Sequence, residues 1–354
     1  MDVLKRRWLT MGEETQEFEK EFSEAFGVKH SIALGNATQA LHLACLAAGI
    51  GSGDEVIVPS LTFVATSNAV LYCGAKVRFA DVSGETDLCI DPESVEAQVS
   101  ERTKAIIVMH YAGFPCNMME IQMIAQKYNL RIIEDAAHAP GGRLNGLPLG
   151  TWGDMGCFSF FSNKNLITGE GGMLVTNQDE LAEKVRRLRS HGMTSLTWDR
   201  HQGHAYSYDV TDLGYNYRID EIRSALGRVQ LKKLGENNRQ RQRITEQYWS
   251  AFSALPITLP FRDLPGEPAY HIFPLLLPEG MDRQKFIEAL KEKGIQTSIH
   301  YPPIHLFKYY VDNFGRVALP RTESLAAREV TLPLYPGMPD EQVDLVIDAV
   351  CSVF

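Results

Sequence analysis

The sequence predicts an α/β protein with a large domain, whose mostly parallel sheet is covered by helices on both faces, and a smaller α+β domain at the carboxyl end. Over residues 1–190, short apolar segments alternate with segments of helical periodicity. From Ile219 onward this alternation gives way to one long helical stretch. The chain has 354 residues, more than one hydrophobic core usually supports. We therefore expect a large domain over residues 1–235 and a small domain over residues 236–354.

The large domain begins with helix-period apolar residues that end at Gly27. After it, short apolar runs predict strands, and the Ala/Leu-rich or amphipathic segments between them predict helices. The predicted strands are 31–34, 55–59, 76–82, 104–110, 131–135, 157–161 and 172–176, and the predicted helices are 40–49, 65–74, 118–130 and 179–192.

A helical stretch over 219–255 joins the small domain to the large one, and a glycine within it is expected to interrupt the helix. A Pro-rich crossing ends this stretch, and the segment 271–277 then predicts a strand. The segment 282–294 predicts a helix, and a closing helix is expected from Asp340.

Composition argues against several functions. The net charge of −9 disfavours binding of nucleic acid or of an anionic membrane, because both require a basic face. No apolar run approaches the ~20 residues of a membrane span, and no apolar segment follows the basic residues near the N-terminus, as a secretory signal would require. The six cysteines lack zinc-finger spacing. We therefore expect reduced thiols, no metal site and a cytoplasmic protein.

The turn 35–38, which leads from a predicted strand into a helix, is the first candidate binding site. Free N–H groups at a helix N-terminus favour a phosphate, and Thr38 adds a hydroxyl donor. The same turn is also compatible with an ordinary Asn/Thr N-cap, which needs no ligand.

Two acidic residues, Glu134 and Asp135, end the buried strand 131–135, at the edge where open α/β sheets bind ligands. A carboxylate at that position can hold a cationic ring nitrogen, or it can simply cap the following turn. His138 lies three residues on and could face the same pocket.

Lys164 lies in FSFFSNKNLITGEGG, between an apolar strand and a glycine cluster. Most lysines are solvated surface residues. A lysine that acts as a covalent catalyst has to lose its proton, which burial and neighbouring dipoles promote. A phosphate-binding turn, an acidic strand end and a buried lysine are together the three groups that pyridoxal 5'-phosphate requires.

Six motifs, in order along the chain, then indicate a family. They are NATQAL at 36–41, VPSLTFVAT at 58–66, EDAAHAPGG at 134–142, FSFFSNKNLITGEGG at 158–172, LGYNYRIDEIRSALG at 213–227 and IHYPPIHLFKYY at 299–310. In these motifs, and over nearly its whole length, the chain resembles the DegT/StrS-type sugar aminotransferases, which are pyridoxal-phosphate enzymes of fold type I. The resemblance implies a seven-stranded sheet and a homodimer with shared active sites.

The resemblance also implies a role for each matching residue. Lys164 would bond covalently to the cofactor and move protons, Asp135 would pair with the ring nitrogen, and His138 would lie near the phenolic oxygen of the ring. The other cofactor-binding residues would be Ala37, Thr38 and Ser159 at the phosphate, Phe63 on the ring face and Asn216 from the neighbouring subunit. The family commonly has glycine in place of Ala37 and glutamine in place of His138.

The segment 300–305 is implied to lie beside the substrate. Tyr301 and one of the two histidines, His300 or His305, would lie near the sugar. Apart from the resemblance, the charge of Arg218 makes it a candidate partner of a substrate diphosphate. A metal site made from the two histidines is disfavoured, because two prolines lie between them and no Asp, Glu or Cys is nearby.

The activity implied by the resemblance is amino transfer. L-glutamate would convert the cofactor to its pyridoxamine 5'-phosphate form, and the amino group would then pass to a keto group of a nucleotide-linked deoxysugar. Such a reaction serves amino-sugar, polysaccharide or antibiotic-sugar biosynthesis. A cyclitol ketone is an alternative acceptor, and a non-transaminating regulator that binds the cofactor is an alternative function. A dehydratase of the same fold is disfavoured, because that branch has histidine in place of Lys164.

Overall fold

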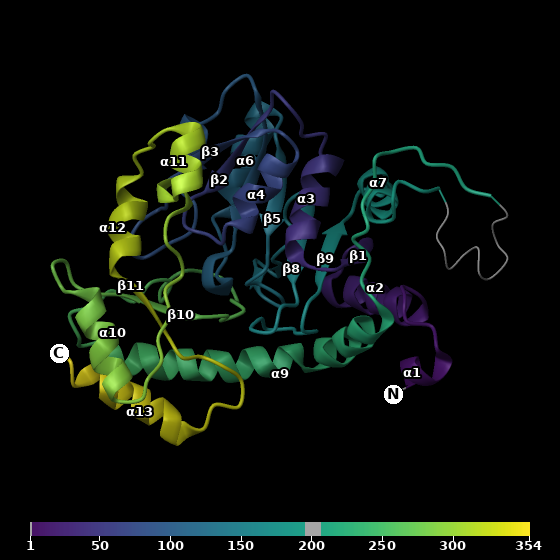
Figure 1. The fold of residues 1–354 in the computed structure, drawn as a ribbon. Coiled ribbons are helices and arrows are strands. Elements are labelled where there is room, and N and C mark those ends of the chain that lie inside the picture. Colours follow the sequence, from purple (N-terminus) through teal and green to yellow (C-terminus); the bar gives the residue numbers. More distant parts are fainter. Residues whose placement is uncertain (1, 195–206) are drawn as a thin grey trace.

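The computed structural model, which describes residues 2–194 and 207–354, is built around a seven-stranded sheet (Figure 1). Its strand order is β1-β9-β8-β5-β4-β2-β3. Neighbours within β8-β5-β4-β2-β3 are parallel, whereas β9 runs antiparallel to both β8 and β1. The strands are β1 (His30–Leu34), β2 (Glu55–Pro59), β3 (Lys76–Ala80), β4 (Thr103–Met109), β5 (Arg131–Asp135), β8 (Met155–Ser159) and β9 (Gly172–Thr176). The mostly parallel, seven-stranded sheet is therefore confirmed.

Helices cover both faces of this sheet, because successive side chains of a strand point to opposite sides. In β4, Ile106 packs into the core on one face and Ile107 into the core on the other. Helices α2 (Glu13–Phe26), α5 (Pro92–Ala97) and α6 (Met118–Tyr128) contribute to the first core, and α3 (Ala37–Ala47), α4 (Ala65–Tyr72) and α7 (Asp179–Arg189) to the second. A short helix, α1 (Asp2–Arg6), precedes α2.

The long helix α9 (Glu221–Phe252) runs beneath the sheet in Figure 1 and connects two hydrophobic cores. Leu234 belongs to the core that α2 and α6 share, whereas Tyr248 and Phe252 belong to a separate core at the carboxyl end. The glycine pause expected in this stretch does not interrupt the helix. A Cβ atom at Gly227 would lie 2.5 Å from the ring of Phe18, so this glycine allows α2 and α9 to pack closely.

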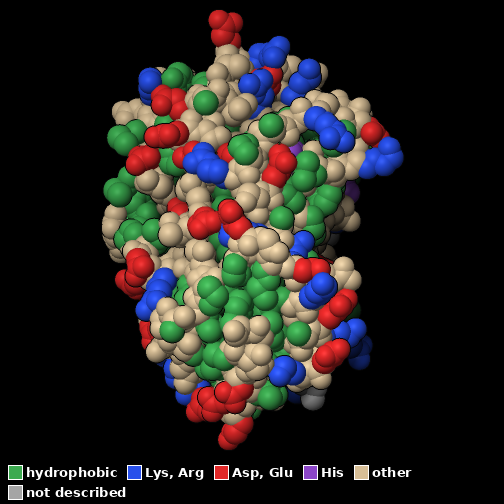
Figure 2. All heavy atoms as spheres, turned by 90° about the vertical axis from the view of Figure 1, so that its left-hand side faces the viewer, with side chains coloured by type: hydrophobic (Ala, Val, Ile, Leu, Met, Phe, Trp, Pro, Cys, Tyr) green, Lys and Arg blue, Asp and Glu red, His purple; other side chains and the backbone are tan. Residues whose placement is uncertain are grey.

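The carboxyl-terminal part combines a two-stranded antiparallel sheet with helices, as expected for an α+β unit. Its strands are β10 (Phe273–Leu276) and β11 (Glu329–Leu332), and its helices are α10 (Arg283–Glu292), η2 (Ile304–Leu306), α11 (Lys308–Phe314), α12 (Pro320–Arg328) and α13 (Asp340–Cys351). On the face of the molecule that α10 to α13 form, hydrophobic side chains gather in the lower half between charged ones (Figure 2).

Several short elements were not predicted: helices α1, α5, α11 and α12, strand β11, the 3-10 turns η1 (Tyr111–Gly113) and η2, and the hairpin of β6 (Arg143–Leu144) and β7 (Leu147–Pro148). Tyr111 of η1 donates its hydroxyl hydrogen to the carbonyl of His300, whereas Arg143 and Pro148 of the hairpin line a second cavity. Every helix within residues 2–194 and 207–354 is too short or too polar to serve as a membrane-spanning segment.

Candidate active site

A cavity of about 440 Å³ opens at the carboxyl edge of the parallel strands, where β4, β5 and β8 end. Its volume lies within the range of small-molecule sites. The predicted site residues that line it are Ala37, Thr38, Phe63, Asp135, His138, Ser159, Lys164, His300 and Tyr301. Residues from the sheet, from the amino end of α3 and from the segment before η2 therefore meet around one space.

Asp135 is the last residue of β5, and its carboxylate is buried. The hydroxyl of Thr66 donates to Oδ2 (2.7 Å), and the N–H of Ala137 donates to Oδ1 (3.2 Å). Burial raises the pKa of Asp135, whereas these hydrogen bonds and the positive charge of Lys164 oppose the increase. A cationic group in the cavity next to this carboxylate would therefore favour its ionised form.

Lys164 lies in the turn after β8, where its backbone N–H donates to the carbonyl of Phe161 (2.9 Å). Burial lowers the pKa of Lys164 to about 8, and the nearby charge of Asp135 acts in the opposite direction. A lysine with this pKa is partly uncharged at neutral pH, as a nucleophilic amine has to be. The cavity thus contains a reactive amine and a carboxylate.

The amino end of α3 provides donors for an anion. The side chain of Asn36 caps the helix by accepting one backbone N–H of the first turn (2.9 Å). The first N–H groups of a helix have no partner inside it, so those of Ala37 and Thr38 are available, next to the hydroxyl of Ser159 in the cavity wall. Gly172 of β9 packs directly behind the turn, because a Cβ there would lie 2.5 Å from the carbonyl carbon of Asn36. The turn is therefore both an N-cap and a potential phosphate cradle.

Two histidines and a tyrosine form a polar wall of the cavity. Tyr301 Oη lies 2.9 Å from His138 Nε2, and His300 Nδ1 lies 2.8 Å from Thr331 Oγ1. Burial lowers the pKa of His138 well below its usual value and that of His300 to about 4, so both rings are neutral at neutral pH. His138 Nδ1 is buried and finds no hydrogen-bond partner within the described parts of the chain.

Phe63 reaches the same cavity from the segment between β2 and α4. Its side chain is 56% exposed, and its ring centroid lies 6.2 Å from that of Tyr301. An exposed aromatic ring at the edge of a pocket is available to stack on a flat ligand.

Three predicted site residues do not line the cavity. Asn216 is exposed in the segment before α9, and Arg218 pairs through its backbone with the end of β1. His305 is buried, with Nδ1 2.6 Å from Ser60 Oγ and Nε2 3.2 Å from Glu323 Oε1. Both ring nitrogens of His305 are engaged within the protein, so this histidine does not contact the cavity.

The two histidines do not face a common site, since His300 lines the cavity and the ring of His305 contacts Ser60 and Glu323. Over the described ranges, no three His, Cys, Asp or Glu side chains are placed to hold a metal ion together.

Among the residues that the sequence did not single out are three in the hydrogen bonds around Asp135 and Lys164: Thr66, Asn165 and His271. His271 Nε2 lies 3.5 Å from Lys164 Nζ, and its Nδ1 lies 2.8 Å from Asn165 Oδ1. Thr66 and Asn165 lie inside motifs that had been recognised, so a closer analysis of those motifs could have found them. His271 lies 107 positions from Lys164, and no sequence signal connects the two.

Known proteins with similar sequences and structures include aminotransferases. The chain is 41% identical over 360 residues to the spore coat polysaccharide biosynthesis protein SpsC of Bacillus subtilis, covering 99% of this chain and 92% of that protein. It matches the structure of PseC from Helicobacter pylori, an aminotransferase involved in the biosynthesis of pseudoaminic acid. The TM-score is 0.93 at 31% identity, covering 100% of this chain and 94% of that chain.

A third similar structure bears on the cofactor. Spr1654 from Streptococcus pneumoniae matches with a TM-score of 0.91 at 28% identity, covering 99% of this chain and 94% of that chain. It has been solved in a pyridoxal-phosphate form and a pyridoxamine-phosphate form.

The residues of the cavity fit this cofactor. The free N–H groups of α3 suit its phosphate, Asp135 suits a protonated ring nitrogen, and Lys164 suits its aldehyde. The unpartnered Nδ1 of His138 leaves one further polar contact open. The profile of the DegT/DnrJ/EryC1/StrS aminotransferase family matches residues 1–351. The chain therefore belongs to this family of pyridoxal-phosphate-dependent sugar aminotransferases, and it has their type I fold.

Proposed function

We propose that this protein transfers the amino group of L-glutamate to a keto group of a nucleotide-linked deoxysugar, in the biosynthesis of an amino-sugar-containing polysaccharide. The observation that carries the proposal is the partly uncharged amine of Lys164 in the same cavity as the buried Asp135. A sugar acceptor is supported by the family and by SpsC, which is named for polysaccharide biosynthesis; PseC is an aminotransferase involved in the biosynthesis of pseudoaminic acid.

Each cavity residue has a role in this proposal. The N–H groups of α3 and the hydroxyls of Thr38 and Ser159 hold the phosphate, Asp135 pairs with the ring nitrogen, and Phe63 stacks on the ring. When bound, pyridoxal phosphate supplies an electron sink that allows the Cα proton of the amino donor to leave.

Lys164 is the group that moves this proton. Its uncharged amine takes the proton from the donor, and the resulting ammonium returns a proton to the reacting molecule in the next step. A pKa of about 8 suits both roles, because general acid–base catalysis is most effective near the working pH. His138 and His300, both neutral, contribute hydrogen bonds in the cavity without adding charge.

The acceptor would bind next to His300 and Tyr301, with Arg218 contacting its diphosphate from outside the cavity. We further propose a homodimer in which Asn216 of one subunit completes the phosphate site of the other. The exposed position of Asn216 outside the cavity supports this arrangement. So does an exposed apolar face of α9, formed by Ile222, Leu226 and Val229.

The test uses the purified protein loaded with pyridoxal phosphate. Adding L-glutamate should bleach its visible absorbance and release 2-oxoglutarate, and a panel of keto-sugar nucleotides should then restore the absorbance. Lys164→Ala should bind the cofactor without either change, with activity reduced at least ~10⁴-fold. Coloured protein that releases no 2-oxoglutarate would instead indicate a regulator, and a response only to keto-inositols would indicate a cyclitol aminotransferase.

A further inference from the structure

His271 is a buried residue in contact with Lys164 that the proposed function does not use. It lies just before β10, with Nε2 3.5 Å from Lys164 Nζ. Its backbone is fixed on both sides, because its N–H donates to the carbonyl of Ala112 (2.8 Å) and its carbonyl accepts from Arg241 Nη1 (2.9 Å). The ring cannot move away from Lys164 without breaking buried hydrogen bonds.

The hydrogen positions on this ring follow from a backbone carbonyl nearby. The side-chain amide of Asn165 lies 2.7 Å from the carbonyl oxygen of Ala269, which can only accept. The amide therefore directs its nitrogen there, and its oxygen is the atom that lies 2.8 Å from His271 Nδ1. Because that oxygen can only accept, Nδ1 of His271 carries a hydrogen.

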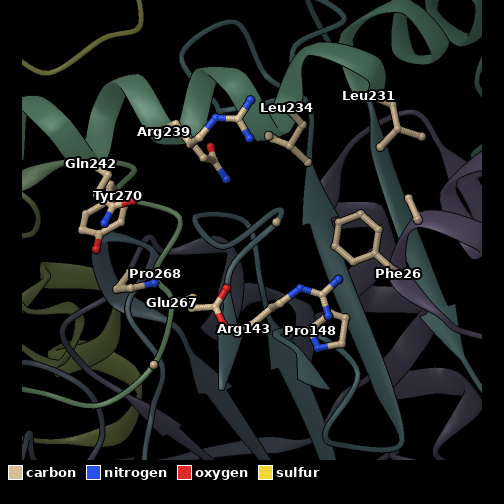
Figure 3. A pocket seen from close by; sticks show the side chains of 15 residues that line it. Phe26, Arg143, Pro148, Leu231, Leu234, Arg239, Gln242, Glu267, Pro268 and Tyr270 are labelled. Carbon is tan, nitrogen blue, oxygen red and sulfur yellow. The ribbon is translucent and has the colours of Figure 1, made fainter. Parts of the chain in front are cut away.

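Asn238 fixes the orientation of the Asn165 amide in the same sense. Its Nδ2 donates to the carbonyl of Pro140 (3.0 Å), and its Oδ1 accepts from Asn165 Nδ2 (2.8 Å). Asn238 lies on α9 and lines a second cavity, which Figure 3 shows from close by with Leu234 and Arg239 of the same helix around it. Two backbone carbonyls thus orient both amides.

His271 is also uncharged. Burial lowers its pKa well below the usual value, and positive charges near it act in the same direction. The titratable and charged groups that face it are His138, with ring centroids 4.2 Å apart, and Lys164, Arg241 and His300. A neutral imidazole with a hydrogen on Nδ1 has its lone pair on Nε2, which is the atom nearest to Lys164.

We infer that His271 is a positioning residue for Lys164: its Nε2 accepts a hydrogen bond from the lysine amine and thereby orients the lone pair of that amine toward the reacting molecule. The inference rests on the proposed function, which assigns proton transfer to Lys164. The proton passes from the donor Cα to Lys164 Nζ and from there back to the reacting molecule, and it never resides on His271. His271 remains neutral throughout and acts as an acceptor, which also stabilises the ammonium once Lys164 has taken the proton.

A matched pair of variants tests the roles of the two ring nitrogens of His271 separately. His271→Asn retains a donor near the position of Nδ1, so Asn165 keeps its partner, but it has no acceptor near Lys164. His271→Gln can extend its side-chain oxygen toward the position of Nε2 and so can restore that acceptor. Thermal denaturation of both variants shows whether the fold is retained.

The first readout needs neither cofactor nor substrate. In the apoprotein, the pH dependence of Lys164 acetylation is followed by mass spectrometry, with the exposed Lys285 as internal control. A hydrogen bond to an ammonium favours the charged form. His271→Asn should therefore lower the pH midpoint of Lys164 acetylation by about one pH unit. The pH midpoint of Lys164 acetylation in His271→Gln should remain close to that in the unaltered protein. Equal midpoints in all three proteins would overturn the inference.

The second readout is the half-reaction of the loaded enzyme with glutamate. His271→Asn should slow it about 10- to 100-fold and increase the isotope effect of Cα-deuterated glutamate, because proton transfer becomes more limiting. His271→Gln should recover most of the rate. Equal losses in both variants with an unchanged isotope effect would contradict positioning. No sugar acceptor takes part in either readout, so a wrong acceptor assignment would leave both results interpretable.

Discussion

The carboxyl group of Glu329 shows how one buried residue fixes the segment that carries His300 and Tyr301. Its Oε2 lies 2.8 Å from the backbone nitrogen of His300, and its Oε1 lies 2.5 Å from the hydroxyl oxygen of Thr331. Thr331 in turn contacts His300 Nδ1 (2.8 Å). Burial raises the pKa of Glu329 from 4.5 to about 8, so the group is mostly protonated at neutral pH.

This raised pKa predicts an unusual dependence of stability on pH. A carboxyl whose folded-state pKa exceeds its unfolded value binds its proton in the folded state at pH values where the unfolded chain has lost it. Its contribution to stability is therefore complete below pH 4.5 and is lost as pH rises through about 8. Glu329→Gln has no such proton to lose, so its melting temperature relative to the unaltered protein should be higher at about pH 9 than at about pH 5. Calorimetry at both pH values measures this, and a pH-independent difference would contradict the raised pKa.

Among the elements, the packing of β9 against the amino end of α3 bears most directly on the cofactor. A Cβ at Gly172 would lie 2.5 Å from the carbonyl carbon of Asn36 and 2.7 Å from the nitrogen of Ala37. Gly172→Ala should therefore displace the turn and weaken pyridoxal-phosphate binding by about 10- to 100-fold, because hydrogen bonds to a charged phosphate are lost. Fluorescence titration of the apoprotein measures this affinity. Gly51→Ala, where an added Cβ meets no atom within 4 Å, is the control, and equal affinities would exclude the proposed cradle.

The elements also show which features the sequence could predict. Buried strands such as Ile132–Ile133 and helices with clear periodicity were predicted, because burial on one or both faces leaves a repeated pattern. Asp135 and Lys164 were predicted because strand ends and glycine clusters mark an edge of the sheet. The helical continuity through Gly227 depends on Phe18, more than 200 positions away, and no local pattern contains that contact. His271 was missed for the same reason, since its role depends on hydrogen bonds between distant segments.

At the scale of the whole molecule, the cavity is assembled from both parts of the chain. Asp135 ends β5 and Lys164 lies in the turn after β8, whereas His300 and Tyr301 come from the segment between α10 and η2. Helix α9 is part of the core under the sheet and of the carboxyl-terminal core, so it fixes the two parts against each other. A shift of one part relative to the other would therefore change the distance between the amine and the histidine wall.

The proposed sharing of sites between subunits can be tested by mixing two defective variants at a cofactor concentration that leaves Asn216→Ala unloaded. Lys164→Ala removes the amine of its own subunit, and Asn216→Ala should reduce cofactor affinity by removing a contact to the phosphate. If Asn216 serves the neighbouring subunit, a mixed dimer has one site with both defects and one intact site. Random reassociation makes half of the dimers mixed, so activity should recover to about one quarter of that of the unaltered protein. If Asn216 serves its own subunit, each site of the mixed dimer carries one defect and mixing restores nothing.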